Sequence, residues 1–289
     1  MPWSRTSVLH DSVASGSDDW QNRAKVTYNA AADSFDAPAL SFWNYFGERT
    51  VRRVRLEPGQ RVLDAACGSG ASALPAAEMV GADGLVVGVD LADRLLQLGR
   101  EKASKRGLTN VRFEAGDMLD LSYADHFFNA VVCVFGIFFV PDMTAAMREL
   151  WRLVRPGGQL AITTWGQNMF EPGNNVFWRS VARLRPDLHK SFSPWERINT
   201  PAGLGGLFVD AGIDGVGIER EDRRHPLPRP EDWWTLACGS GYRGTLEQMT
   251  AAQVDQVRDE TISFFRESDI TGVETNVIYA VATKPGTPG

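Results

Sequence analysis

Between Arg61 and Thr164 the sequence alternates short apolar runs with longer stretches of helical spacing, and this alternation restricts the fold more than any other feature. Runs that are apolar at nearly every position are typical of strands covered on both faces, as in a parallel sheet with crossover helices. Five strands are predicted, at Arg61–Asp64, Leu85–Asp90, Val111–Ala115, Ala130–Val134 and Gln159–Thr164. The pattern therefore predicts an α/β chain with a doubly wound, mostly parallel sheet.

The clearest helix of this region precedes the fifth strand. Its apolar stripe consists of Met143, Met147, Leu150 and Val154, and Arg155-Pro156-Gly157-Gly158 ends it. Such a helix would connect the fourth strand to the fifth.

The second half of the chain leaves this alternation twice. A segment rich in Trp, Phe, Pro and Asn follows Trp165, and Thr200-Pro201 then predicts a helix that leads to a strand near Gly215–Glu219. A second irregular segment contains a capping box of Thr250 and Gln253. We interpret the two irregular segments as insertions that cover the sheet.

Composition limits the partners. The 289-residue chain has a net charge of −6, which argues against a nucleic acid as the main partner. The cysteines, Cys67, Cys133 and Cys238, lie too far apart to suggest a metal site or a disulfide framework. Because the sequence has no apolar segment suited to export or to a membrane span, we expect a cytoplasmic protein.

A glycine turn follows the first strand in Val62-Leu63-Asp64-Ala65-Ala66-Cys67-Gly68-Ser69-Gly70. Glycines at positions 68 and 70 allow a sharp bend, and they let backbone N–H groups approach a bound nucleotide or amino-acid moiety. Gly68 to Ala73 also satisfies the G-x-G-x-x-G/A pattern of dinucleotide enzymes. The turn alone therefore leaves the cofactor open.

Three carboxylates, Asp64, Asp90 and Asp117, follow successive predicted strands and should meet at one edge of the sheet. Asp90 can accept hydrogen bonds from the hydroxyls of a ribose. Asp64 would repel a pyrophosphate but would attract a cofactor that carries an amine and a sulfonium. The carboxylates thus favour S-adenosylmethionine over a dinucleotide.

With these motifs the sequence resembles the class I S-adenosylmethionine-dependent methyltransferases, particularly the branch of the ubiquinone and menaquinone C-methyltransferases. The resemblance covers Tyr28 to Thr164. Besides the glycine turn it rests on Gly88-Val89-Asp90-Leu91, Gly116-Asp117-Met118, Phe128-Asn129-Ala130-Val131-Val132 and Leu153-Val154-Arg155-Pro156-Gly157-Gly158. It implies a seven-stranded Rossmann-like sheet with an antiparallel last strand and helical cap insertions.

The resemblance also implies a domain plan. The expected parts are a helical lid at 1–50, the cofactor-binding core at 51–165, a first cap insertion at 166–199, a return to the core at 200–221, a second cap insertion at 222–272, and the last strand and tail at 273–289.

The same resemblance implies a cofactor site. The residues assigned to it are Tyr28, Asp64, Ala66, Gly68, Gly70, Asp90, Leu91, Gly116, Asp117, Met118, Val134 and Phe135. Asp117 would accept a hydrogen bond from the adenine amino group, and Tyr28 would face the cofactor from the N-terminal helix. Two residues depart from the family pattern, Ala66 where many members have glycine and Asn129 where Asp is usual.

For the acceptor, aromatic residues of the fourth strand end and of the caps predict an apolar pocket. The candidates are Phe138, Phe139, Phe177, Trp178 and Trp234. His189, His225 and Tyr242 are the candidates for a catalytic base, and none lies at a motif spacing that identifies it.

The sequence therefore predicts a methyltransferase in which a small, largely apolar acceptor attacks the sulfonium methyl in line. It does not separate methylation at carbon, oxygen or nitrogen, and it leaves the oligomeric state open, with a homodimer included. Two alternatives stay open at this point. One is a nicotinamide-dependent oxidoreductase, which the glycine pattern and Asp90 would fit, and the other is a protein that binds S-adenosylmethionine without transferring its methyl group.

Overall fold

The computed structural model describes residues 17–190 and 193–286, so the first 16 residues of the predicted lid and the end of the tail lie outside the described part. Its main sheet has seven strands in the order β3-β2-β1-β4-β5-β9-β6. The strands are β1 (Arg61–Ala65), β2 (Leu85–Asp90), β3 (Val111–Ala115), β4 (Phe128–Val134), β5 (Val154–Trp165), β6 (Gly217–Glu221) and β9 (Val277–Thr283). β1 to β5 are parallel, and β9 pairs antiparallel with both β5 and β6. The predicted fold class is confirmed.

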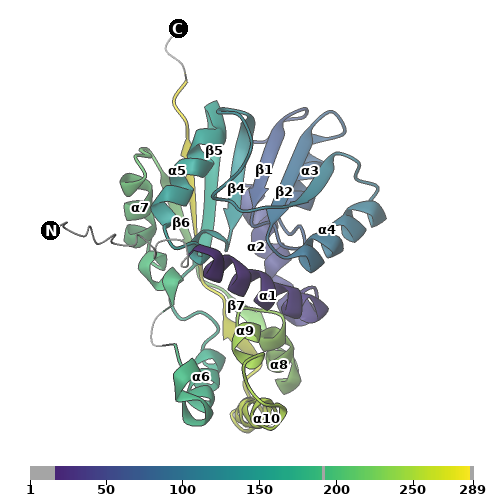
Figure 1. The fold of residues 1–289 in the computed structure, drawn as a ribbon, viewed down its shortest axis with the longest axis vertical. Coiled ribbons are helices and arrows are strands. Elements are labelled where there is room, and N and C mark those ends of the chain that lie inside the picture. The colour runs from purple at the N-terminus through teal and green to yellow at the C-terminus, as the bar shows by residue number, and fades with distance from the viewer. Residues whose placement is uncertain (1–16, 191–192, 287–289) are drawn as a thin grey trace, which may run out of the picture.

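Helices cover both faces of this sheet (Figure 1). One layer consists of α2 (Phe42–Val51), α3 (Ala73–Val80) and α4 (Asp93–Lys105). In it, α3 and α4 pack on β1 to β3, and α2 packs on β4 and β5. The opposite layer consists of α5 (Met143–Leu153) and α7 (Pro201–Asp210), which contact each other. The central strands are thus buried on both sides, as their continuous apolar sequence requires.

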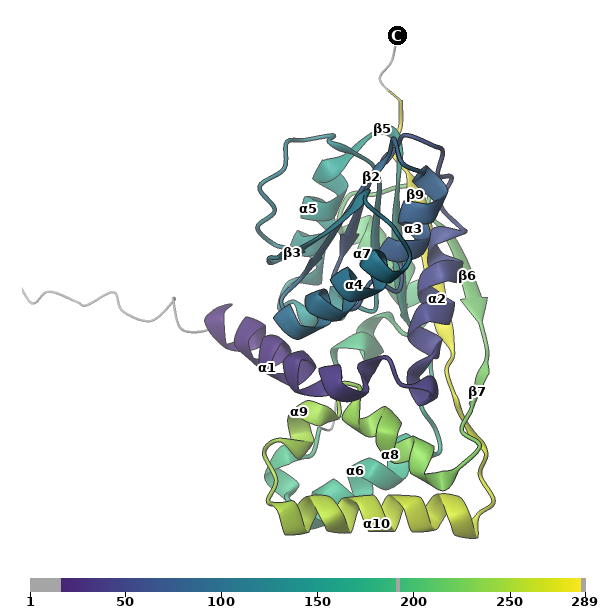
Figure 2. The same cartoon turned by 90° about the vertical axis from the view of Figure 1, so that its right-hand side faces the viewer.

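A group of cap helices lies beyond one end of the sheet (Figures 1 and 2). It contains α6 (Gly173–Leu184), α8 (Pro230–Cys238), α9 (Arg243–Leu246) and α10 (Ala251–Glu267), together with the paired strands β7 (Arg224–Pro226) and β8 (Gly272–Glu274). Short 3₁₀ helices are η1 (Pro38–Leu40), η2 (Ile137–Phe139), η3 (Pro186–Leu188) and η4 (Pro194–Ile198).

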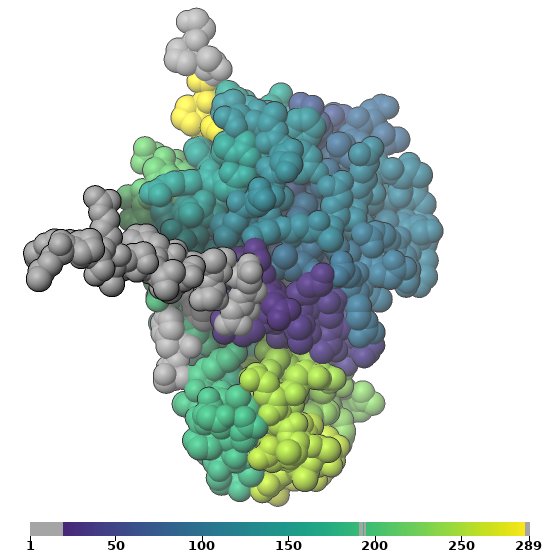
Figure 3. Space-filling view, viewed as in Figure 1, coloured from purple at the N-terminus to yellow at the C-terminus, as the bar shows by residue number. Residues whose placement is uncertain are grey.

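The helix α1 (Ser17–Phe35) packs on α4 on one side and on α8 and α9 on the other. Figure 3 shows α1 in purple, between the sheet part and the cap.

The predicted helix caps agree with the structure. Thr200 caps α7 by accepting a hydrogen bond from the backbone of Gly203, and Thr250 with Gln253 forms the capping box of α10. Asn129, the departure from the family pattern, accepts a hydrogen bond from the backbone N–H of Arg61 at 3.0 Å. Asparagine therefore supports the start of β1 without the charge of aspartate.

The starts of two strands, β4 and β5, differ from the prediction by two residues or more. Val154 was predicted as the last member of a helical stripe, but it is the first residue of β5, which pairs there with Phe128 of β4. β4 and β5 both begin before their predicted starts, and the register between them shifts between Phe128 and Ala130. Because of this irregularity, β5 includes Pro156 and Gly157, two residues that a sequence pattern assigns to a turn.

In the described ranges, no helix combines the length and the apolar character that crossing a membrane requires.

Candidate active site

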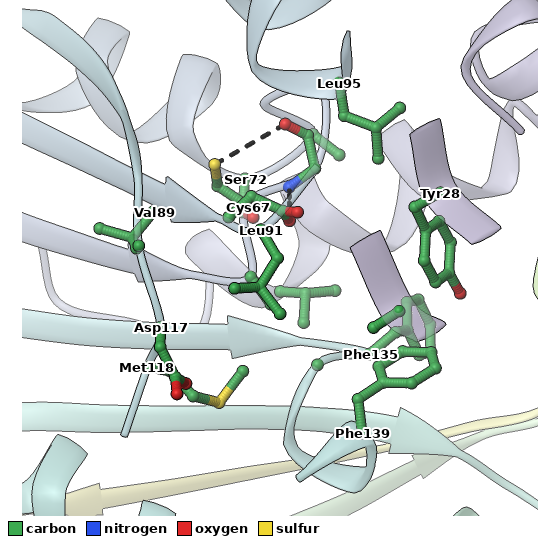
Figure 4. Close-up of a pocket in the computed structure, with 18 of the residues that line it drawn as sticks. Tyr28, Cys67, Ser72, Val89, Leu91, Leu95, Asp117, Met118, Phe135 and Phe139 are labelled. Carbon is green, nitrogen blue, oxygen red and sulfur yellow. Dashed lines mark hydrogen bonds between the residues drawn. The ribbon is translucent and has the colours of Figure 1, made fainter. Parts of the chain in front are cut away.

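A cavity lies at the carboxyl ends of β1, β2 and β4, and residues of α1 line one of its sides. Its open space measures about 890 Å³, the solvent at its mouth included. Figure 4 shows Asp117 and Met118 at one end, Tyr28, Phe135 and Phe139 at the other, and Leu91 between them. The cavity is thus elongated along the edge of the sheet.

The glycine turn forms the floor of the cavity. Ala66, Gly68 and Gly70 all have left-handed backbone angles, with φ of 60°, 52° and 89°. Gly68 lines the cavity, whereas a Cβ at Gly70 would lie 2.9 Å from the ring of Phe113. The two glycines therefore differ in role, because Gly68 faces the cavity and Gly70 allows the turn to pack on β3. Gly70 does not line the cavity, although the resemblance assigns it to the cofactor.

Ala66 holds a conformation that costs a residue with a Cβ about 1–2 kcal/mol. We expect Ala66→Gly to stabilise the protein by about 0.5–1 kcal/mol, because the relief of this strain exceeds the added backbone entropy of the unfolded chain. Thermal unfolding should show a rise of roughly 1–2 °C. The neighbour Ala65→Gly is the control, since Ala65 is an ordinary buried residue of β1 and should lose stability. Equal losses in the two variants would contradict strain at Ala66.

Asp90 sits at the end of β2 and is held by the turn that it faces. Its two carboxylate oxygens accept backbone N–H bonds from Gly68 at 2.8 Å and from Ala92 at 2.9 Å. Burial raises its pKa. Each oxygen keeps a further lone pair, so the carboxylate can also accept hydrogen bonds from two ligand hydroxyls.

Asp64 lies behind the cavity rather than in its wall. It is fully buried, and one oxygen accepts a hydrogen bond at 2.7 Å from Ser72, which does line the cavity. Burial raises the pKa of Asp64 to about 7. Its other oxygen, Oδ1, is buried and has no hydrogen-bond partner within residues 17–190 and 193–286. A buried acceptor of this kind fits a ligand that brings a donor, such as an ammonium group.

From the sequence alone, Asp64 is expected to carry a fixed negative charge that selects the cofactor. The structure modifies this point, because a carboxyl group with a pKa of about 7 is only partly ionised at neutral pH. A cationic group that paired with Asp64 would favour its charged form.

The far end of the cavity is lined by Gly116, Asp117 and Met118, with Leu91 and Trp20 nearby in the wall. Asp117 accepts hydrogen bonds from the backbone of Leu119 at 2.9 Å and from the side chain of Gln21 in α1. An apolar slot with one carboxylate at its edge suits a flat heteroaromatic ring that bears an amino group.

Several lining residues lie outside the positions that the sequence motifs identified. Trp20 and Ala24 precede the predicted Tyr28 at four-residue spacing, so one face of α1 covers the cavity. This spacing was a readable signal of an amphipathic helix face. Phe35 and Trp43 also line the cavity and stack on each other with ring centroids 5.4 Å apart.

Aromatic rings form the end of the cavity next to β4. Phe135 has a left-handed φ of 55° and stacks on Trp165 with centroids 4.0 Å apart. Trp43 meets Phe135 edge to face, and Tyr28 meets Phe139 in the same way. Burial, and then the charge of Asp90, raise the pKa of Tyr28, so its hydroxyl stays protonated.

Of the predicted acceptor-pocket residues, only Phe139 lines this cavity. Phe138, its neighbour in η2, instead packs edge to face on Trp195. Phe177 and Trp178 of α6 pack on Tyr242, and Trp234 of α8 packs on the apolar core. The cap helices bury their own aromatic residues against one another, as helices with an apolar stripe must.

The three candidate bases do not line the cavity either. His189 is exposed. His225 is buried beside Phe42, and its Nε2 is 3.0 Å from the carbonyl oxygen of Ala39. Tyr242 donates its hydroxyl to Asn174 at 2.6 Å, and burial raises its pKa well above the usual value. These hydrogen bonds support the cap and its contact with η1.

Comparisons with known proteins agree with this geometry. A family model described as a methyltransferase domain matches residues 62–158. The demethylmenaquinone methyltransferase of Listeria welshimeri is 33% identical over 180 residues, which cover 58% of this chain and 76% of that protein. The demethylmenaquinone methyltransferase of Bacillus cytotoxicus is 27% identical over 214 residues, 69% of this chain and 90% of that protein.

Solved structures share the fold at lower identity. A SAM-dependent methyltransferase from Aquifex aeolicus is 22% identical, with a TM-score of 0.51 over 68% of this chain and 90% of that one. A Haemonchus contortus phosphoethanolamine N-methyltransferase in complex with S-adenosylhomocysteine is 16% identical, with a TM-score of 0.58 over 92% of this chain and 60% of that one. The [4+2]-cyclase SpnF is 20% identical, with a TM-score of 0.53 over 84% of this chain and 81% of that one.

Proposed function

Because the chain belongs to the class I S-adenosylmethionine-dependent methyltransferases, in the branch related to the menaquinone-pathway enzymes, we propose that it methylates a ring carbon of a small hydroquinone-like acceptor. S-adenosylmethionine is its cofactor. The family assignment removes the nicotinamide-dependent alternative. What is proposed is the acceptor class, the site of methylation and the role of each residue.

The cavity supports a cofactor that spans it from end to end. We assign the adenine ring to the slot beside Asp117 and Met118, and the ribose hydroxyls to Asp90. We assign the methionine ammonium to the unpartnered Oδ1 of Asp64, which lies behind the wall next to Ser72. Each assignment pairs a ligand donor with a carboxylate oxygen that has a free lone pair. The glycine turn at Gly68 lets the backbone approach the same ligand.

One observation carries the proposal for the acceptor, namely the aromatic end of the cavity. Tyr28, Trp43, Phe135 and Phe139 make walls that suit a flat apolar ring. In the described chain, the ionisable side chains that line the cavity are Tyr28, Cys67, Asp90 and Asp117, with no histidine or lysine among them. An acceptor that needs a strong base would find none at this end, whereas an electron-rich hydroquinone ring supplies its own nucleophilic carbon.

The bound cofactor supplies an electrophilic methyl group on a sulfonium. An acceptor ring carbon held in line at the aromatic end of the cavity would take up that methyl group as the carbon–sulfur bond breaks, and S-adenosylhomocysteine would be the other product. The proton on the attacked carbon then passes to solvent. The residues of this chain contribute by holding the two reactants in line and by excluding water, an effect worth roughly 7–11 kcal/mol in well-oriented systems.

The proposal is tested with methyl-labelled S-adenosylmethionine and a panel of a 2-alkyl-1,4-naphthohydroquinone, a simple phenol and an aromatic amine. We expect label on a ring carbon of the hydroquinone, identified by NMR and mass spectrometry of the product. A methoxy or N-methyl product would overturn the proposed site of methylation. Transfer to the phenol or the amine alone would overturn the acceptor class, and both results would leave the family assignment intact.

A further inference from the structure

Gln21 occupies a position that no cofactor motif includes. It lies in the first turns of α1, next to Trp20, which lines the cavity. Its side-chain amide donates a hydrogen bond to Oδ2 of Asp117, across 96 residues of sequence. The bond joins the helix over the cavity directly to the carboxylate at the adenine end.

The geometry leaves Asp117 with a defined orientation. Its Oδ1 accepts from the backbone of Leu119 at 2.9 Å, and its Oδ2 accepts from Gln21. A carboxylate held at both oxygens cannot rotate freely, yet each oxygen retains a lone pair for another donor. Without Gln21 one oxygen would be released, and the carboxylate could turn about its terminal bond.

We propose that Gln21 is a positioning residue for base recognition, which holds the Asp117 carboxylate ready to accept the 6-amino group of adenine. This inference rests on the proposed assignment of Asp117 to that amino group. It makes α1 part of the adenine subsite, with Trp20 as its apolar cover and Gln21 as its polar support. Discrimination among purine bases then depends on α1 as well as on the sheet.

The test compares two ligands that differ only at the base, S-adenosylhomocysteine and S-inosylhomocysteine, in which an oxo group replaces the 6-amino group. The wild-type chain should prefer S-adenosylhomocysteine by about a hundredfold or more, because an oxo group would face a carboxylate. Gln21→Met keeps the length and the helix preference of the side chain but removes its amide. We expect this variant to lower the preference by about tenfold in titration calorimetry, the effect of losing one hydrogen bond to a charged group.

Gln97→Met is the matched control. Gln97 is an exposed glutamine of α4 whose amide donates to Glu101 at 3.0 Å, so the same substitution there should leave both affinities unchanged. A second variant, Gln21→Glu, keeps the size of the side chain and places a carboxylate against Asp117. It should bind S-adenosylhomocysteine more weakly than Gln21→Met does, because like charges then face each other.

The outcomes separate the inference from the assignment on which it rests. If Gln21→Met weakens both ligands equally, or neither, Gln21 has no part in base recognition and the inference is overturned. If the wild-type chain binds both ligands equally, the assignment of Asp117 fails and the inference fails with it. Tight binding of S-adenosylhomocysteine in that case would still agree with the family.

Discussion

Asp90→Ala should weaken binding of S-adenosylhomocysteine by roughly a hundredfold or more, with a matching loss of methyl transfer at low cofactor concentration. The carboxylate is proposed to accept two ribose hydroxyls, and each hydrogen bond to a charged group contributes about 1.5–3 kcal/mol. It also holds the glycine turn through the backbone of Gly68. The substitution therefore removes both the ligand contact and a support of the turn.

Two further variants separate these effects. Asp90→Asn keeps one oxygen acceptor and should fall between the wild type and Asp90→Ala in affinity measured by calorimetry. Asp83→Ala removes the same charge from an exposed position before the opposite end of β2 and should bind as the wild type does. Unchanged affinity in Asp90→Ala would refute the ribose assignment, provided that thermal unfolding shows a folded protein.

Asp64→Asn should have opposite effects on binding and on stability. Loss of the charge removes the proposed partner of the methionine ammonium, so the affinity for S-adenosylhomocysteine should fall by about tenfold to a hundredfold at pH 8. The ligand-free protein should instead gain about 1–3 kcal/mol at that pH. The gain arises because ionising Asp64 in its buried position is unfavourable.

The sign of the pH dependence follows from the raised pKa. Asp64 titrates near 3.8 in the unfolded chain and at about 7 in the folded protein, because burial disfavours its charged form. Between these values the folded state binds the extra proton, so stability falls as pH rises from about 4 to about 7 and then levels off. Affinity for the ligand should rise over pH 6 to 8, as Asp64 becomes able to pair with the ammonium group. In Asp64→Asn, the part of the pH dependence of stability and of ligand affinity that comes from Asp64 should disappear.

Asp232→Asn provides a control with the opposite sign. Although the burial of Asp232 acts to raise its pKa, hydrogen bonds from Arg229 lower it overall. Its substitution should therefore destabilise the protein at neutral pH and leave ligand affinity unchanged. If Asp64→Asn were destabilising to the same degree at pH 8, the unfavourable ionisation of Asp64 would be refuted.

The predictable part of the fold came from periodicity. Strands β2 and β3 have the predicted bounds, because β2 is an apolar run, β3 alternates apolar with charged residues, and turn residues flank both strands. The start of β5 was wrong, since Val154 continues the helical stripe in sequence but pairs with Phe128 in space. The sequence around Val154 does not indicate its pairing with Phe128, because Pro156 and Gly157 follow and are typical of a turn rather than of a strand.

Some residues of the candidate site could likewise be predicted from the sequence, and others could not. Asp90 and Asp117 could be placed at one edge because parallel strands bring their carboxyl ends together. Trp43 and Gln21 could not, because Trp43 reaches the cavity, and Gln21 reaches Asp117, from segments far from the strand ends in sequence. His225 and Tyr242 are candidates for a catalytic base only because of their residue types. In the structure their hydrogen bonds go to Ala39 and Asn174, away from the cavity.

Local apolar spacing and backbone freedom specify the sheet, the glycine turn and the carboxylates at the strand ends, so these features can be predicted from the amino-acid sequence. The raised pKa of Asp64, the contact of Gln21 with Asp117, and the division of the aromatic residues between cavity and cap cannot be predicted in this way. They depend on burial and on hydrogen-bond partners from distant segments, which come together only when the chain packs.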